Sequence, residues 1–228
     1  MGGGMDLEEV WRIREEDIYP ELFGTKSRGI FTLDDGVFKQ LGQDRLDPRW
    51  LSIGIWEFAP TEARSCWMYA TSGLSNPWYW EDESGAESDI EPGGMSGFGM
   101  EFLFATPQQG DWAIRYLQTI LAYDILLYAD CFPGRGPIGP GNRVSFNAPI
   151  NHDSNCVLWG SVVSRAEAFP AGFVLPSGEV EFFTVTGVAN DEIRFGQANS
   201  TAALIERLTA AGAYPVTDPA RRAVPLSE

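Results

Sequence analysis

The order of strand-like and helix-like segments constrains the fold of this chain more than any other feature. Apolar residues recur at helical spacing from Asp111 to Leu127, which predicts a helix that Asp111 caps. Helices and strands do not alternate regularly, so we expect an α+β single domain with a mainly antiparallel sheet packed by helices. Apolar, β-branched and aromatic runs predict the strands, at 50–58, 66–71, 98–104, 144–146, 156–163, 173–175 and 180–188.

Shorter helices are expected near both ends. Near the C-terminus, a helix begins at Ser200 or Thr201 and ends at Gly212. Near the N-terminus, a helix ends before Pro20, because the residue before a proline disfavours helical geometry. We divide the chain into an N-terminal helical extension, 1–18, and a domain, 19–228. The residues predicted to share one face of the N-terminal helix are Leu7, Val10, Trp11, Arg14 and Ile18.

Acidic side chains are concentrated in two short stretches. The 228 residues include 32 acids against 16 Lys and Arg, a net charge of −16. Residues 6–21 hold seven acids and two bases, a net of −5, and residues 81–91 hold six acids and no base, a net of −6. Such a surface repels phosphates and anionic lipids, so we expect no nucleic acid and no membrane as partners. An acidic stretch of this kind is typical of a solvated loop, and it is also typical of a surface that binds a basic partner. Both interpretations stay open.

Three aromatic side chains directly precede the second acidic stretch. Large aromatics supply much of the binding energy at protein interfaces, and a flap folded back over the sheet is the alternative use for them. The acids would steer a basic partner and the aromatics would anchor it. The predicted partner-binding residues here are Trp78, Tyr79, Trp80, Glu81, Asp82, Glu83, Glu87, Asp89 and Glu91.

The sequence offers little for catalysis or cofactor binding. Its single histidine, His152, lies in a polar stretch that reads as a surface turn. Residues 134–139 match G-x-G-x-x-G, but Pro137 and Pro140 prevent the helix that a dinucleotide site needs. We therefore expect no catalytic residue, no metal and no cofactor. One enzymatic alternative stays open, a carboxylate pair of Glu101 with Glu179 or Glu181, because such partners can be distant in the chain.

Cysteine usage and the N-terminus indicate the compartment. Cys66, Cys131 and Cys156 are widely spaced, form no C-x-x-C pair and are expected to be reduced thiols. No apolar run approaches the roughly 20 residues of a membrane span, and residues 1–6 lack the pattern of a secretory signal. The chain is therefore expected in the cytoplasm.

Several motifs, taken in order, resemble the suppressor of fused family. They are Tyr69–Asn76, Ser96–Phe104, Leu121–Ala122 and Val180–Val188, supported by Tyr19–Pro20, Asp47–Pro48, Thr217–Asp218 and Arg221–Arg222. The resemblance covers about residues 19–224 and implies an α+β domain without known catalytic activity.

The resemblance also implies how such a domain works. Animal relatives sequester transcription factors by clamping an extended peptide between this domain and a second one. Their peptide-contacting Tyr and Asp align with Asp124 and Asn142, so this chain retains neither residue. Similar bacterial single-domain proteins include immunity factors that neutralise toxins. Our leading hypothesis is such an immunity protein for a basic toxin domain, and the alternative is a regulatory scaffold that captures a peptide.

Overall fold

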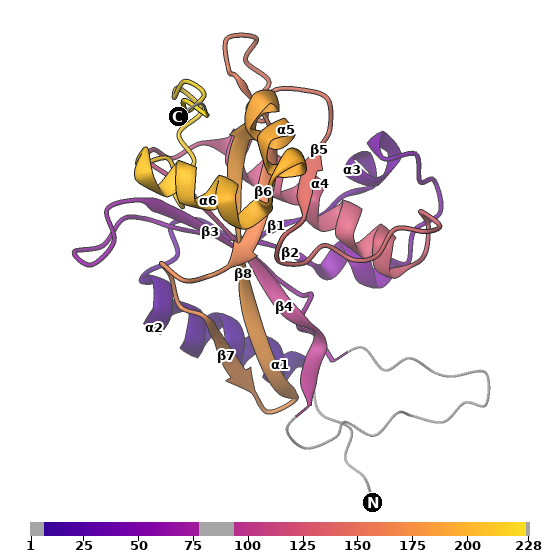
Figure 1. Ribbon diagram of the computed structural model, residues 1–228. Helices are drawn as coiled ribbons and strands as arrows, with labels where there is room; N and C mark the ends of the chain where they lie inside the picture. Colours follow the sequence, from indigo (N-terminus) through magenta and orange to yellow (C-terminus); the bar gives the residue numbers. More distant parts are fainter. Residues whose placement is uncertain (1–6, 78–93, 227–228) are drawn as a thin grey trace, which may run out of the picture.

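A single mixed sheet forms the centre of the molecule. The computed structural model describes residues 7–77 and 94–226. Its eight described strands have the order β1-β2-β3-β4-β8-β6-β5, and β7 also pairs with β8. At the centre, β4 (Met95–Thr106) and β8 (Gly178–Ala189) are parallel. The other described strand pairs are antiparallel, which confirms the expected α+β class with a mainly antiparallel sheet (Figure 1).

Most strands lie where apolar and β-branched runs predict them. The predicted strand at 50–58 is too long, because Pro48–Ser52 forms a 3-10 helix, η2, and the strand starts only at Gly54. The Asp47 side chain caps η2 by accepting from the Arg49 amide, a contact that favours a helical turn over an extended chain. The remaining strands are β1 (Phe31–Thr32), β2 (Gly54–Phe58), β3 (Trp67–Ser72), β5 (Arg143–Ser145), β6 (Leu158–Arg165) and β7 (Gly172–Leu175).

The predicted long helix is α4 (Asp111–Tyr128). Its N-cap residue is Gly110 rather than Asp111, so the predicted cap is wrong by one residue. Asp111 lies in the first helical turn, where its carboxylate accepts from Arg28 at 2.9 Å. A negative charge is favourable there because it meets the positive end of the helix dipole.

The N-terminal helix does not end before Pro20. Three helical segments run on without a break: α1 (Leu7–Arg12), a π-helical turn η1 (Ile13–Ile18) and α2 (Tyr19–Phe23). Pro20 lies in the first turn of α2, where the missing N–H of proline is tolerated. The prediction failed because it did not allow for the wider π-helical turn in front of the proline.

Three further helices complete the described part of the chain. α3 (Asp35–Gln40) and α5 (Asn190–Ala198) are not anticipated by the sequence, whereas α6 (Thr201–Ala210) is. Ser200 caps α6 by accepting from the Ala203 amide at 3.0 Å, and Gly212 follows the helix with a φ of 68°. Within the described residues, no helix combines the length and apolar character that crossing a bilayer requires.

Helices cover both faces of the sheet. On one face, called the α4 face below, Phe102 and Phe104 of β4 belong to the same buried cluster as Leu117 and Ile120 of α4. On the opposite face, Tyr19 and Phe23 of α2 join Leu103 and Phe182. α5 and α6 also cover this opposite face, where Leu204 and Leu208 meet Val162 and Val188. Figure 1 shows these two helices together, and α1 and α2 near β7.

Candidate functional site

A buried carboxylate lies under the turn that precedes the predicted binding segment. Glu101 of β4 is fully buried, and its Oε1 accepts from the amides of Gly73 and Ser75, each at 2.9 Å. The hydroxyls of Ser75 and Thr71 also donate to the Glu101 carboxylate, both at 2.6 Å. Four donors thus satisfy a charge that would be costly to bury alone. The carboxylate holds the turn 72–76 against the sheet.

Arg14 brings the N-terminal helix to the same turn. Its buried guanidinium donates to the Ser75 hydroxyl at 3.0 Å and to the Asn76 side-chain oxygen at 2.8 Å, and it lies 3.9 Å from Glu101. Trp11 donates to the same Asn76 oxygen at 2.9 Å. The N-terminal helix therefore fixes the position of Asn76, the residue that directly precedes Pro77.

Residues at the start of β4 meet the same turn. The Ser96 hydroxyl donates to the Ser75 carbonyl at 2.6 Å, and the Phe98 amide donates to the Leu74 carbonyl at 2.8 Å. Gly97 has a φ of 58°, and a Cβ on it would lie 2.3 Å from the Asn76 carbonyl oxygen. Both ends of the segment between Asn76 and Ser96 are thus attached to one buried turn.

The predicted partner-binding aromatics and acids from Trp78 to Glu91 lie outside the described residues, so they remain a prediction. The other two predicted residues, Asp124 and Asn142, are described. Each binds the Pro/Gly segment 133–141, which has no regular structure, and thus no helix follows the G-x-G-x-x-G match, as Pro137 and Pro140 predict. Asp124 accepts from the Ile138 amide at 2.6 Å, and Asn142 accepts from the Gly139 amide at 2.8 Å.

Asp124 and Asn142 differ in burial. Asn142 is exposed, whereas Asp124 is fully buried in α4 under Ile138. The second carboxyl oxygen of Asp124 has no hydrogen-bond partner among the described residues. Burial raises the pKa of this carboxyl to about 7, and the hydrogen bond from Ile138 opposes the rise. A partner can touch Asn142 directly, but it reaches Asp124 only if Ile138 moves.

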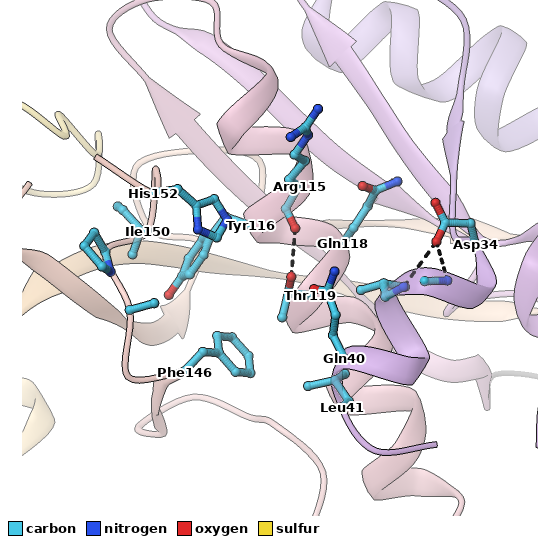
Figure 2. A pocket seen from close by; sticks show the side chains of 14 residues that line it. Asp34, Gln40, Leu41, Arg115, Tyr116, Gln118, Thr119, Phe146, Ile150 and His152 are labelled. Carbon is cyan, nitrogen blue, oxygen red and sulfur yellow. Dashed lines mark hydrogen bonds between the residues drawn. The ribbon is translucent and has the colours of Figure 1, made fainter. Parts of the chain in front are cut away.

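A groove of about 650 Å³ lies between α3, α4 and the loop 146–152. Tyr116, Phe146 and His152 line one side of it, and Gln40 and Leu41 line the other (Figure 2). His152 is exposed with a φ of 60°, and its amide donates to the Pro149 carbonyl at 3.0 Å, which confirms the predicted surface turn. In the described part of the chain, no three His, Cys, Asp or Glu side chains gather closely enough to hold a metal ion.

The structure does not bring together the carboxylates that the enzymatic alternative requires, Glu101 with Glu179 or Glu181. Met100 pairs with Glu181 and Glu101 pairs with Phe182, so Glu101 and Glu181 point to opposite faces of the sheet. Glu179, two residues before Glu181, shares the face of Glu181. Glu101 is buried, and Glu181 binds Arg165 at the surface. The two carboxylates proposed for a shared pocket are therefore separated by the sheet itself.

Sequence reasoning missed the network of Arg14 and Glu101. The signal for Arg14 was present, because an arginine occupied the apolar face of the predicted helix. The signal for Glu101 was a single acid within the apolar run 98–104. A charged residue at a position that must be buried needs a partner, and this requirement would have singled out both residues.

These features define a class of protein, an α+β domain in which buried polar contacts hold the turn 72–76 to the sheet and the segment 133–141 to α4. The family described as Suppressor of fused protein (SUFU) matches residues 49–222 of the chain. The chain belongs to the suppressor of fused family, as the resemblance predicts.

Solved structures share this fold. A structure of the Sufu–Fu complex has a TM-score of 0.60 and 19% identity over 96% of this chain and 89% of that chain. Drosophila Suppressor of Fused has a TM-score of 0.57 and 19% identity over 75% of this chain, which spans 42% of the fly chain. A SUFU homolog from Neisseria gonorrhoeae FA 1090 has a TM-score of 0.52 and 16% identity over 77% of this chain and 80% of that chain. No curated protein matches the sequence.

Proposed function

We propose that this chain is a non-enzymatic protein-binding domain of the bacterial cytoplasm, and that it neutralises a toxin domain with a basic surface. Family membership supports the first part, because a related fold is known in a complex, the Sufu–Fu complex. The acidic character of the chain supports the second part. A toxin that acts on nucleic acid needs a basic surface, and an acidic protein can compete with phosphate for it.

The single observation that carries the proposal is the charge of residues 81–91, six acids without a base, directly after three aromatic residues. The acids would raise the rate of encounter with a basic partner, and Trp78, Tyr79 and Trp80 would supply the buried contact. The attachment of Asn76 and Ser96 to one turn favours this use, since it limits the entropy that the segment loses on binding.

The experiment that tests the proposal is co-expression with the protein encoded by the adjacent gene. We expect the two proteins to co-purify and the growth defect caused by the neighbour alone to disappear. A neighbour that is harmless alone, or that stays toxic and unbound in the presence of this chain, would refute the toxin-neutralising function.

Charge reversal tests the role of the acidic segment. The triple variant Glu81→Lys, Asp82→Lys and Glu83→Lys should weaken binding at low salt by about tenfold or more, because steering by opposite charges is strongest there. The matched control places the same charge change on exposed acids elsewhere, Glu62→Lys, Glu167→Lys and Glu206→Lys. If both triple variants bind like the unchanged protein, steering by residues 81–91 is wrong.

A second candidate function is capture of an extended peptide on a free sheet edge. The observation that favours it is the position of β5, which ends the described sheet and pairs only with β6. An added strand would satisfy the open backbone groups of β5. The two candidates differ in what suffices for binding, since the scaffold binds a short peptide of the partner and the immunity protein requires the folded domain.

A further inference from the structure

Two exposed apolar side chains lie in one row with a glutamate. Met95 of β4 pairs with Glu179 of β8, and Val174 of β7 pairs with Glu179 from the other side. Residues paired in this way point to the same face of a sheet. We call this row of Met95, Glu179 and Val174 the tip face.

The exposure of the tip face is unusual within this molecule. Met95 is 60% exposed and Val174 is 68% exposed, and among the described residues Val157 (41%) is the remaining large hydrophobic side chain that is exposed. Met95 lies against Gly99, since a Cβ on Gly99 would be 2.7 Å from the Met95 methyl carbon. The methionine side chain is therefore laid along β4, and the two exposed apolar groups lie one on each side of the glutamate.

In the part of the chain that the structure describes, helices cover the sheet around the tip face but not the row itself. On the opposite face, Val180 and Leu175 are buried with Val10 of α1. On the α4 face, helix cover ends at Tyr128, whose ring stacks on Phe98 at 3.8 Å. Figure 1 shows the ends of β4, β8 and β7 projecting beyond α4. The strands of the tip face are thus covered by α1 on the opposite face, and no helix of the described residues covers Met95 and Val174.

The charge of the tip face determines what fits it. The Glu179 side chain is exposed and forms no hydrogen bond or ion pair with any residue of 7–77 and 94–226. The next glutamate on this face, Glu181, is already paired with Arg165. A partner that covers Met95 and Val174 must satisfy the Glu179 carboxylate, which is costly to bury without partners, and a Lys or Arg does so with hydrogen bonds and an opposite charge together.

We propose that the tip face is a docking surface for a basic protein domain, which contributes an apolar side chain between Met95 and Val174 and a Lys or Arg to Glu179. This inference rests on the proposed function, whose partner it describes more closely. The partner contact would then include part of the described sheet.

The first experiment measures binding of the co-purified neighbour to tip-face variants by calorimetry. Glu179→Lys and the double variant Met95→Ser, Val174→Ser should each raise the dissociation constant about tenfold or more, as expected for a buried contact and its ion pair. The matched controls are Glu206→Lys, an exposed acid on α6, and Val157→Ser, the third exposed apolar residue. Tip-face variants that bind like their controls would overturn the inference and leave the toxin-neutralising function intact.

The second experiment tests the tip face even if the neighbour does not bind and the proposed function is wrong. The Met95 methyl group is observed by NMR in protein labelled at methionine methyl carbons, while a peptide of alternating Lys and Val is added in large excess. Such a peptide carries both groups proposed to contact the tip face, and a contact far weaker than that of a folded domain is enough to shift the signal. The buried Met68 and Met100 provide internal references. We expect the Met95 signal to shift, and to shift far less with a peptide of alternating Glu and Val. Equal responses to both peptides, or no response, would overturn the inference.

Discussion

Replacing Asp124 by asparagine should remove a large part of the pH dependence of folding. The folded protein raises the pKa of this carboxyl from 3.8 to about 7, first because of burial. The folded state therefore binds the proton more tightly than the unfolded chain, so stability falls as pH rises from about 4 to about 7. The free energy of unfolding falls by about 1.4 kcal/mol for each pH unit in this window. Above pH 7 the total loss is therefore about 4 kcal/mol.

Asparagine preserves the contact that the structure shows. Its side-chain oxygen can accept from the Ile138 amide as the Asp124 oxygen does, and it carries no charge at any pH. We expect Asp124→Asn to match the unchanged protein near pH 5 and to exceed its stability near pH 8 by up to about 3 kcal/mol, the part of the loss that falls between pH 5 and pH 7. In a domain of this size, that difference corresponds to a rise of about 10 °C in the melting temperature.

Urea unfolding followed by tryptophan fluorescence at both pH values measures the difference. The control is Asp130→Asn, the same change at an exposed position two residues after α4, where the φ of 53° suits asparagine equally well. If the stabilities of the Asp124→Asn and unchanged proteins fall in parallel between the two pH values, burial of a titrating Asp124 is refuted.

Three other substitutions test the contacts that hold the turn and the last helix. Arg14→Met should cost about 3–5 kcal/mol in urea unfolding, because Glu101 then loses a buried countercharge. Gly97→Ala should destabilise by about 2 kcal/mol or more in the same assay, since a φ of 58° and the Asn76 carbonyl both oppose a Cβ. Ser200→Ala should lower stability by about 1 kcal/mol, the usual effect of losing an N-cap, measured by thermal unfolding. Stabilities unchanged within 0.5 kcal/mol, about the spread for neutral surface changes, would contradict each assignment.

The sequence predicted the helices and strands that depend on a residue pattern within one segment. The apolar spacing of α4 and the β-branched run of β8 each lie within one element, so the sequence reveals them directly. The parallel pairing of β4 with β8 joins residues about 80 positions apart and leaves no trace in either segment. α3 and α5 are short, and their residues mix polar with apolar types too evenly for a period to appear.

The candidate site was predictable only in part for the same reason. Arg14 donates to Ser72 and Ser75, which follow it by 58 and 61 positions, so no local pattern links them. What the sequence contained was the anomaly of a charge on an apolar face, at Arg14 in the first helix and at Asp124 in α4. Both residues turned out to be buried. Charged residues on predicted buried faces are therefore better guides to polar networks than the exposed charges that first attract attention.

The motifs that carry the family resemblance also gain a physical meaning. Thr71, Ser75 and Glu101 bind one another beneath the turn, and the Arg221 guanidinium binds the buried Glu192 at 2.7 Å near the end of the chain. These residues hold backbone in place and are turned away from solvent. The family motifs thus specify the buried network that supports the fold. Recognition of a partner is left to side chains that are exposed on that fold. Under the proposed function, binding specificity would change through residues 78–91 or the tip face, while the buried network, and with it the fold, stayed the same.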